Sequence, residues 1–105
     1  MLDIGFIGHV AAGGSLPLAI QCRDSEFKPV SPTSVPLYRV YPDGFGSYAA
    51  SGYLGESDTG GKVGFRTGSL PISTSTFSAG ELYTILFEYR AAGSERKAIG
   101  TFLVD

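Results

Sequence analysis

The stretch GESDTGGKVGF, residues 55–65, comes closest to a phosphate-binding loop, because two glycines precede a lysine. A Walker loop needs the lysine at a fixed spacing, a Ser or Thr directly after it, a strand before the loop and a helix after it. Here Lys62 comes one residue too late after Gly55, a valine follows it, and the next residues alternate as in a strand. We therefore predict a turn between two strands, in which Asp58 and the glycine pair supply the turn conformations.

A second glycine motif, GFGSYA at 44–49, matches the permissive form of the dinucleotide fingerprint. That fingerprint acts between a strand and a helix, inside one of two βαβ halves. The continuation AASGY is a poor helix former, and 105 residues leave no room for a second half. We predict a loop that joins two strands.

Nucleophilic catalysis and zinc binding also lack the residues they need. The chain has one histidine, His9, in a glycine-rich segment, and one cysteine, Cys22, which alternates with apolar residues as a core side chain does. No G-x-S-x-G elbow occurs. A structural zinc site takes four ligands, so this pair is too small a set.

The acidic residues leave one alternative open. They show no D-x-D spacing of the kind that calcium loops use. Paired glycosidase carboxylates can converge in space from any two positions, so an acid pair stays an alternative to solvated loop charges. We expect no catalytic residue, no cofactor and no metal. The acids that could supply oxygen ligands for calcium are Asp24, Glu26, Asp43, Glu56 and Asp58.

Composition narrows the class of protein. A chain of 105 residues fits one domain, and 43% hydrophobic with 17% charged residues is apolar enough to bury a core. The net charge of −2 and the absence of any long basic run argue against a nucleic-acid partner. Asp3 stands where a signal peptide has basic residues, and no apolar run spans a bilayer. We expect a soluble protein or a component of a soluble assembly, without a membrane partner.

Period-2 alternation predicts strands along most of the chain, whereas glycine and proline interrupt every helical window. The predicted strands are LPLAIQC (16–22), VPLYRVY (35–41), YAASGYL (48–54), KVGFRT (62–67), a weaker ISTSTF (72–77), ELYTILFEYRA (81–91) and KAIGTFLV (97–104). The run 81–91 should be the central core strand, and it should form a hairpin with the last strand around the turn AGSE at 92–95. This pattern predicts an all-β fold, a single sandwich of about seven strands.

Residues 1–15 form a separate case. They carry four glycines and no regular alternation, which indicates either an arm that is ordered on a partner or an ordinary first strand. We keep both alternatives for 1–15 and assign 16–105 to the sandwich domain.

Apolar and aromatic residues outside the expected core are the candidates for a partner interface. An arm would bury its apolar side chains only on contact, and the Ser/Gly/Tyr-rich stretch DGFGSYAASGY has the composition of an adaptable interface. Edge-strand and loop packing is the alternative for the aromatic residues. The candidates are Leu2, Ile4, Phe6, Ile7, Phe45, Tyr48 and Tyr53.

From residue 16 onward the order of features resembles the small immunoglobulin-like β-sandwich domains of tailed-bacteriophage virion proteins. The resemblance rests on LPLAIQCRDSEFKPV, VPLYRVYPDG, the turn at the glycine pair, and the closing FSAGELYTILFEYRAAG with KAIGTFLVD. Its motifs are F-x-x-G-x-L-Y before a long strand and F-L-V at the end.

The resemblance implies a non-enzymatic virion structural protein. Such domains decorate capsids or build tails and baseplates, so we expect the major capsid protein or another virion protein as partner. Homo-oligomers and a place in the virion, assembled in the host cytoplasm, follow from the same resemblance. Because the last strand ends beside Asp105, a capsid decoration subunit is the first expectation and a tail or baseplate component the second. A carbohydrate-binding module, which would use Phe45, Tyr48 or Tyr53, is the alternative from another class.

Overall fold

The computed structural model describes residues 4–42 and 46–105, which form seven strands and one short 3₁₀ turn. The strands are β1 (Ile4–Val10), β2 (Ser15–Gln21), β3 (Leu37–Tyr41), β4 (Ala50–Tyr53), β5 (Phe65–Pro71), β6 (Leu82–Ala91) and β7 (Ser94–Val104). The 3₁₀ turn η1 (Thr59–Gly61) lies between β4 and β5. No helix in this part of the chain is long and apolar enough to cross a bilayer.

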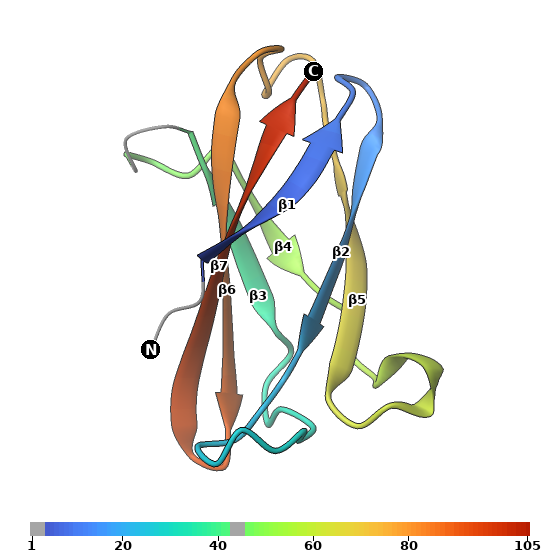
Figure 1. The fold of residues 1–105 in the computed structure, drawn as a ribbon, viewed down its shortest axis with the longest axis vertical. Helices are drawn as coiled ribbons and strands as arrows, with labels where there is room; N and C mark the ends of the chain where they lie inside the picture. The colour runs from blue at the N-terminus through green and yellow to red at the C-terminus, as the bar shows by residue number, and fades with distance from the viewer. Residues whose placement is uncertain (1–3, 43–45) are drawn as a thin grey trace.

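The strands build two sheets that face each other (Figure 1). The larger sheet has the order β1-β7-β6-β3-β4, and the smaller sheet pairs β2 with β5. β1 runs parallel to β7, while the other pairs are antiparallel. In immunoglobulin-like sandwiches the second strand likewise pairs with a later strand of one sheet, while the third and the last two share the other. The prediction of an all-β sandwich of seven strands is confirmed.

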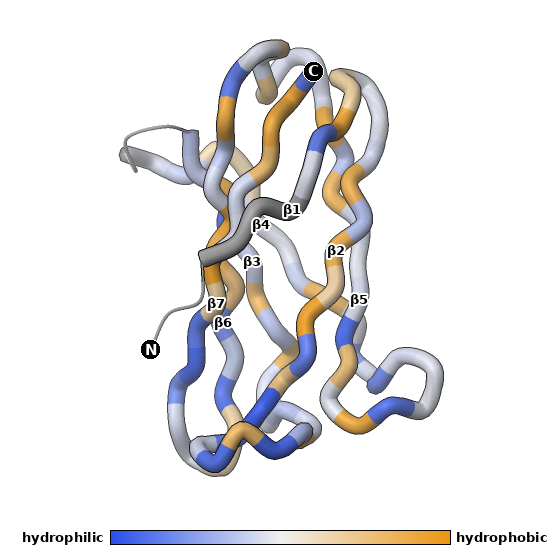
Figure 2. The backbone as a smooth tube through the Cα atoms, in the orientation of Figure 1, coloured by the Kyte–Doolittle hydropathy of each residue, from blue (hydrophilic) through white to orange (hydrophobic). Residues whose placement is uncertain are grey.

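The core lies between the two sheets, because every second residue of each long strand points inward. In β6 the inward residues Tyr83, Ile85, Phe87 and Tyr89 are buried, and Phe102 of β7 is completely buried. The two strands of the smaller sheet contribute leucines to the same cluster. Figure 2 shows that hydrophobic residues are frequent in the upper part of the sandwich, whereas its lower end is largely hydrophilic.

The motif F-x-x-G-x-L-Y forms a corner at the start of β6. The Tyr83 hydroxyl accepts a hydrogen bond from the Ser78 backbone N–H at 2.8 Å, five residues upstream. Its ring lies 4.9 Å from the Phe77 ring and 5.7 Å from the Phe102 ring, centroid to centroid. This arrangement is similar to the tyrosine corner of immunoglobulin-like sandwiches, in which a tyrosine bonds back to the preceding backbone.

The hairpin between β6 and β7 is tighter than the sequence predicts. Ala91 pairs with Ser94, so the turn consists of Ala92 and Gly93 alone. Both have positive φ, 51° and 80°, as a two-residue turn of the mirror-image type requires. The predicted four-residue turn was therefore two residues too long.

Two other predictions differ from the structure. The weak strand at 72–77 is a turn, in which the backbone N–H groups of Thr76 and Phe77 bond to the Ser73 carbonyl. The Ser73 hydroxyl also accepts the Ser75 backbone N–H at 3.2 Å, and such local bonds compete with strand pairing. The strand predicted from 62 begins only at Phe65, because Gly64 has φ +74° and forms a turn. Val63 is therefore exposed in a loop instead of sharing a strand face.

Residues 4–10 of the N-terminal segment form a strand of the larger sheet. β1 pairs with the second half of β7, from Ile4 beside Ile99 to Val10 beside Val104. The register shifts between Phe6 and Gly8. The first half of β7 lies beyond the reach of β1, which leaves this part of the strand without a neighbour among the described residues on that side (Figure 1).

Candidate functional site

The loop GESDTGGKVGF is held by an arginine from the strand that follows it. Arg66 is buried, and its Nε donates to Asp58 Oδ1 at 3.0 Å while its Nη1 donates to the Gly55 carbonyl at 3.0 Å. Ser31 Oγ donates to the other carboxylate oxygen of Asp58 at 2.7 Å. These bonds from Ser31 and Arg66 lower the pKa of Asp58. The predicted turn between two strands is confirmed, and its Asp58 carboxylate is paired with Arg66.

Gly64 brings this loop into direct backbone contact with the loop that follows β2. An added Cβ would collide with the Val30 carbonyl and lie 2.8 Å from the Cys22 carbonyl. The Gly64 carbonyl accepts the Cys22 N–H at 2.8 Å, so the two backbones touch directly. No side chain fits between them, and glycine is required here.

Cys22 and His9 take part in structure. Cys22 is fully buried against Tyr89 and Ala91, and burial raises the pKa of its thiol to about 11. The thiol therefore stays protonated at neutral pH, and thiolate chemistry needs the deprotonated form. His9 Nδ1 lies 2.9 Å from Asp105 Oδ1 on the surface, which connects β1 to the end of β7.

The outer face of the larger sheet, which points away from β2 and β5, carries apolar side chains. β6 and β7 pair in register, so Leu82 lies beside Leu103 and Leu86 beside Ile99. All four are partly exposed, and Leu82 keeps 47% of its surface. A solvated face of an antiparallel sheet normally carries polar residues at these positions. We call these four residues the outer patch, and exposed apolar patches mark interaction surfaces.

The other half of the outer face carries charges that are matched in pairs. Glu88 lies beside Lys97, and Arg90 beside Glu95, in neighbouring positions of β6 and β7. Arg39 of β3 adds an ion pair, Nη1 to Glu88 Oε1 at 2.9 Å. Opposite charges across a strand pair stabilise the sheet and leave little net field. Apart from the Thr84–Thr101 pair between the two apolar pairs, apolar and charged residues therefore occupy separate halves of one face.

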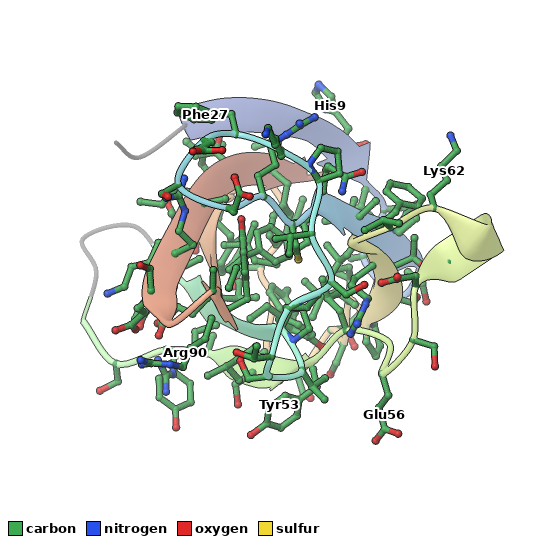
Figure 3. The ribbon with its side chains drawn as sticks, turned by 90° about the horizontal axis from the view of Figure 1, so that it is seen from below. His9, Phe27, Tyr53, Glu56, Lys62 and Arg90 are labelled. Carbon is green, nitrogen blue, oxygen red and sulfur yellow. The ribbon has the colours of Figure 1, made fainter. Side chains whose placement is uncertain are left out.

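Two tyrosines extend the outer face toward the edge formed by β4. The Tyr48 ring meets the Tyr41 ring edge to face at 6.3 Å, and the Arg39 guanidinium lies 5.8 Å from its centre. Tyr53 is 69% exposed and borders a hollow of about 270 Å³ that Glu88 and Arg90 also line. Figure 3 shows Tyr53 pointing away from the body of the molecule on the same side as Arg90.

The structure brings together only part of the predicted interface set. Tyr48 and Tyr53 are both exposed, but they lie near opposite ends of β3, beside Tyr41 and Leu37 respectively. Ile4, Phe6 and Ile7 belong to β1, whose backbone is part of the sheet. Leu2 and Phe45 lie outside the described residues.

Sequence reasoning missed the outer patch, although its signal was present. The run ELYTILFEYRA carries leucine at 82 and 86, on the face opposite to its buried aromatic residues. A strand that is apolar on both faces is typical of one that is covered on both sides. The prediction assigned only one of these faces.

No family model, curated protein or solved structure matches this chain. Within residues 4–42 and 46–105, no three metal-binding side chains gather in one place. The outer patch and the two exposed tyrosines are therefore the surface features that indicate a function.

Proposed function

We propose that this chain is a non-enzymatic structural protein of a tailed-phage particle, a capsid decoration subunit that binds a shell protein through its outer patch. The observation that supports this proposal is the apolar character of Leu82, Leu86, Ile99 and Leu103 on a sheet face that faces solvent. The phage setting comes from the resemblance of the sequence to virion sandwich domains.

The geometry of the outer patch fits a protein partner. A hollow of about 420 Å³ lies beside Leu82 and is lined by Pro42, Gly80 and Glu81, so an apolar side chain of a partner can insert next to the patch. The sheet face supplies contact area, and the paired charges beside the patch form a polar rim. Tyr48 adds an exposed aromatic ring of the type enriched in interfaces.

A co-sedimentation experiment with purified phage particles tests the patch. Leu82→Glu places a charge in the patch, and we expect at least a tenfold loss of particle binding without loss of folding, since a buried unpaired charge is costly. Val63→Glu is the matched control, because Val63 is similarly exposed, at 53%, but lies in a loop. Equal binding by both variants, or no binding by the unaltered chain, would contradict the proposal.

The number of copies of this chain per particle distinguishes a place on the capsid from a place in the tail. Quantitative mass spectrometry of intact particles should find this chain in numbers comparable to the shell protein if it decorates the capsid. A few copies per particle would instead assign it to the tail or baseplate, and absence from particles would remove the virion proposal.

Tyr53 favours a second candidate function, a carbohydrate-binding module. Its exposed ring stands beside a hollow lined by Glu88, Arg90 and Glu95, which combines a stacking surface with hydrogen-bonding groups. Saturable binding on a glycan array that Tyr53→Ala abolishes would support this candidate. Unchanged binding in that variant would exclude Tyr53 as the sugar platform.

A further inference from the structure

A cavity of about 240 Å³ opens between the two sheets, on the side where β1 leaves the first half of β7 uncovered. Ile20 and Gln21 of β2 line one wall, Arg96, Lys97 and Ala98 of β7 line the other, and the loop after β2 closes the lower end. Phe27 belongs to that loop and lies on the opposite side of the molecule from Tyr53 and Arg90 (Figure 3). The cavity opens on the opposite side of the molecule from the hollow beside Tyr53, although Tyr89 lines both and Lys97 also lies beside Glu88 on the outer face.

The charges of this cavity are all of one sign. Arg23, Arg96 and Lys97 line it, three of the eight basic residues of a chain whose net charge is −2. No acidic residue lines it, and none of the ion pairs among the described residues involves these three. The nearest cross-strand carboxylate, that of Glu88 beside Lys97, is bonded to Arg39.

The loop after β2 positions two arginines, its own Arg23 and Arg96 of β7. Arg23 Nη1 donates to the Phe27 carbonyl at 2.8 Å, and the Arg96 guanidinium lies 5.9 Å from the centre of the Phe27 ring. Arg23 also donates its backbone N–H to the Tyr89 hydroxyl at 3.0 Å. Each guanidinium keeps further N–H groups for a ligand, since a guanidinium has five. Donors positioned before binding lose less conformational entropy when the ligand arrives.

Phe27 has a strained backbone conformation in this loop. It has φ +62°, a conformation that phenylalanine rarely adopts, and 66% of its surface is exposed. Asp24 over-determines the turn, because its carboxylate accepts the backbone N–H groups of Glu26 at 2.8 Å and Lys28 at 3.1 Å. Backbone strain held by a local network in this way is typical of ligand sites. The same bonds turn the Asp24 carboxylate toward the loop backbone.

We propose that this cavity, formed by Arg23, Phe27, Arg96 and Lys97, binds a ligand that carries a phosphate or sulfate group. Guanidinium groups bind such oxyanions with paired, charge-assisted hydrogen bonds. The Arg23 and Arg96 guanidinium groups, with Lys97 at the rim and no carboxylate in the lining, favour a divalent oxyanion over a single carboxylate. The volume admits one such group with few further atoms, while the exposed Phe27 ring offers its face to the attached organic part.

Titration of the ¹⁵N-labelled full chain with sodium phosphate and, separately, sodium sulfate, at constant ionic strength, tests the proposal. We expect saturable amide shifts confined to residues 20–28 and 94–98, with a dissociation constant on the order of 1 mM because the site is open to solvent. Tighter binding of phosphate or of sulfate would identify the natural source of the oxyanion. Acetate should bind at least fivefold more weakly, and equal binding of acetate would overturn the divalent assignment.

Three variants distinguish a specific phosphate site from nonspecific electrostatic attraction. Arg96→Gln should weaken phosphate binding about tenfold. Arg96→Lys keeps the charge but loses the paired N–H donors of the guanidinium, and it should weaken phosphate binding about threefold. Arg90→Gln removes the same charge on the far side of the molecule and should leave binding unchanged. Absence of saturation, or equal weakening by the Arg90 and Arg96 variants, would overturn the proposal. Leu82→Glu should not affect these titrations, so the result is independent of the capsid proposal.

Discussion

Two loops at the lower end of the sandwich use arginine and positive φ in opposite ways. The loop between β4 and β5 buries Arg66 against the Asp58 carboxylate, and its left-handed positions are glycines, Gly60, Gly61 and Gly64. At the loop after β2, Arg96 of β7 lies beside the Phe27 ring without a carboxylate partner. The left-handed position of this loop is Phe27 itself. The first loop is optimised for stability, whereas the second keeps charge and strain that folding alone does not require.

Gly64→Ala should have the largest effect, because it forces a Cβ into the contact between the two loops. We expect a loss of about 3 kcal/mol in the free energy of unfolding, from the left-handed backbone and the clash together. Gly60→Ala is the matched control, since Gly60 also has positive φ, +65°, but its Cβ would meet open space. The control should lose only about 1 kcal/mol in urea unfolding. Similar losses in both variants would contradict the close contact.

Acid should weaken the loop between β4 and β5 through Asp58. The pKa of Asp58 is lower in the folded chain than in the unfolded chain, so its contribution to stability is full above the unfolded pKa of about 4 and disappears as pH falls through the folded pKa. Asp58→Asn should therefore be less stable at pH 7 and lose less stability between pH 5 and pH 2. Parallel stability curves for the variant and the parent would refute the role of this pair.

Phe27→Asn should have the smallest effect, and in the opposite direction. Asparagine tolerates the left-handed conformation, and the exposed ring contributes little burial, so we expect a gain of about 0.5 kcal/mol in thermal or urea unfolding. Phosphate binding should weaken in the same variant, because the ring that positions Arg96 is lost. A destabilised variant would show that Phe27 contributes to folding and not to a ligand site.

The strands were predictable because alternation is a local property of the sequence. The run 81–91 shows the inward residues of β6, β3 ends at Tyr41 directly before Pro42, and the glycine pair lies between β4 and β5 as predicted. The boundaries failed where local hydrogen bonds compete with pairing, as at Ser73, or where one glycine delays a strand, as at Gly64.

The candidate sites were less predictable because they join distant parts of the chain. Arg23 and Arg96 meet only after β2 and β7 have been placed in facing sheets, and no spacing in the sequence indicates that placement. The outer patch could have been predicted from the alternating positions of Leu82 and Leu86. Its pairing with Ile99 and Leu103 depends on the register of the hairpin.

The parallel pairing of β1 with β7 has a consequence for how the molecule forms. His9 and Asp105 meet across 96 positions of sequence, so β1 can find its partner only after the most distant strand has been synthesised. Contacts of such long range carry a high loop-closure cost and slow the folding of β proteins. The β6–β7 hairpin, with its two-residue turn, can form early, and β1 should be the last strand to dock and the first to leave on unfolding.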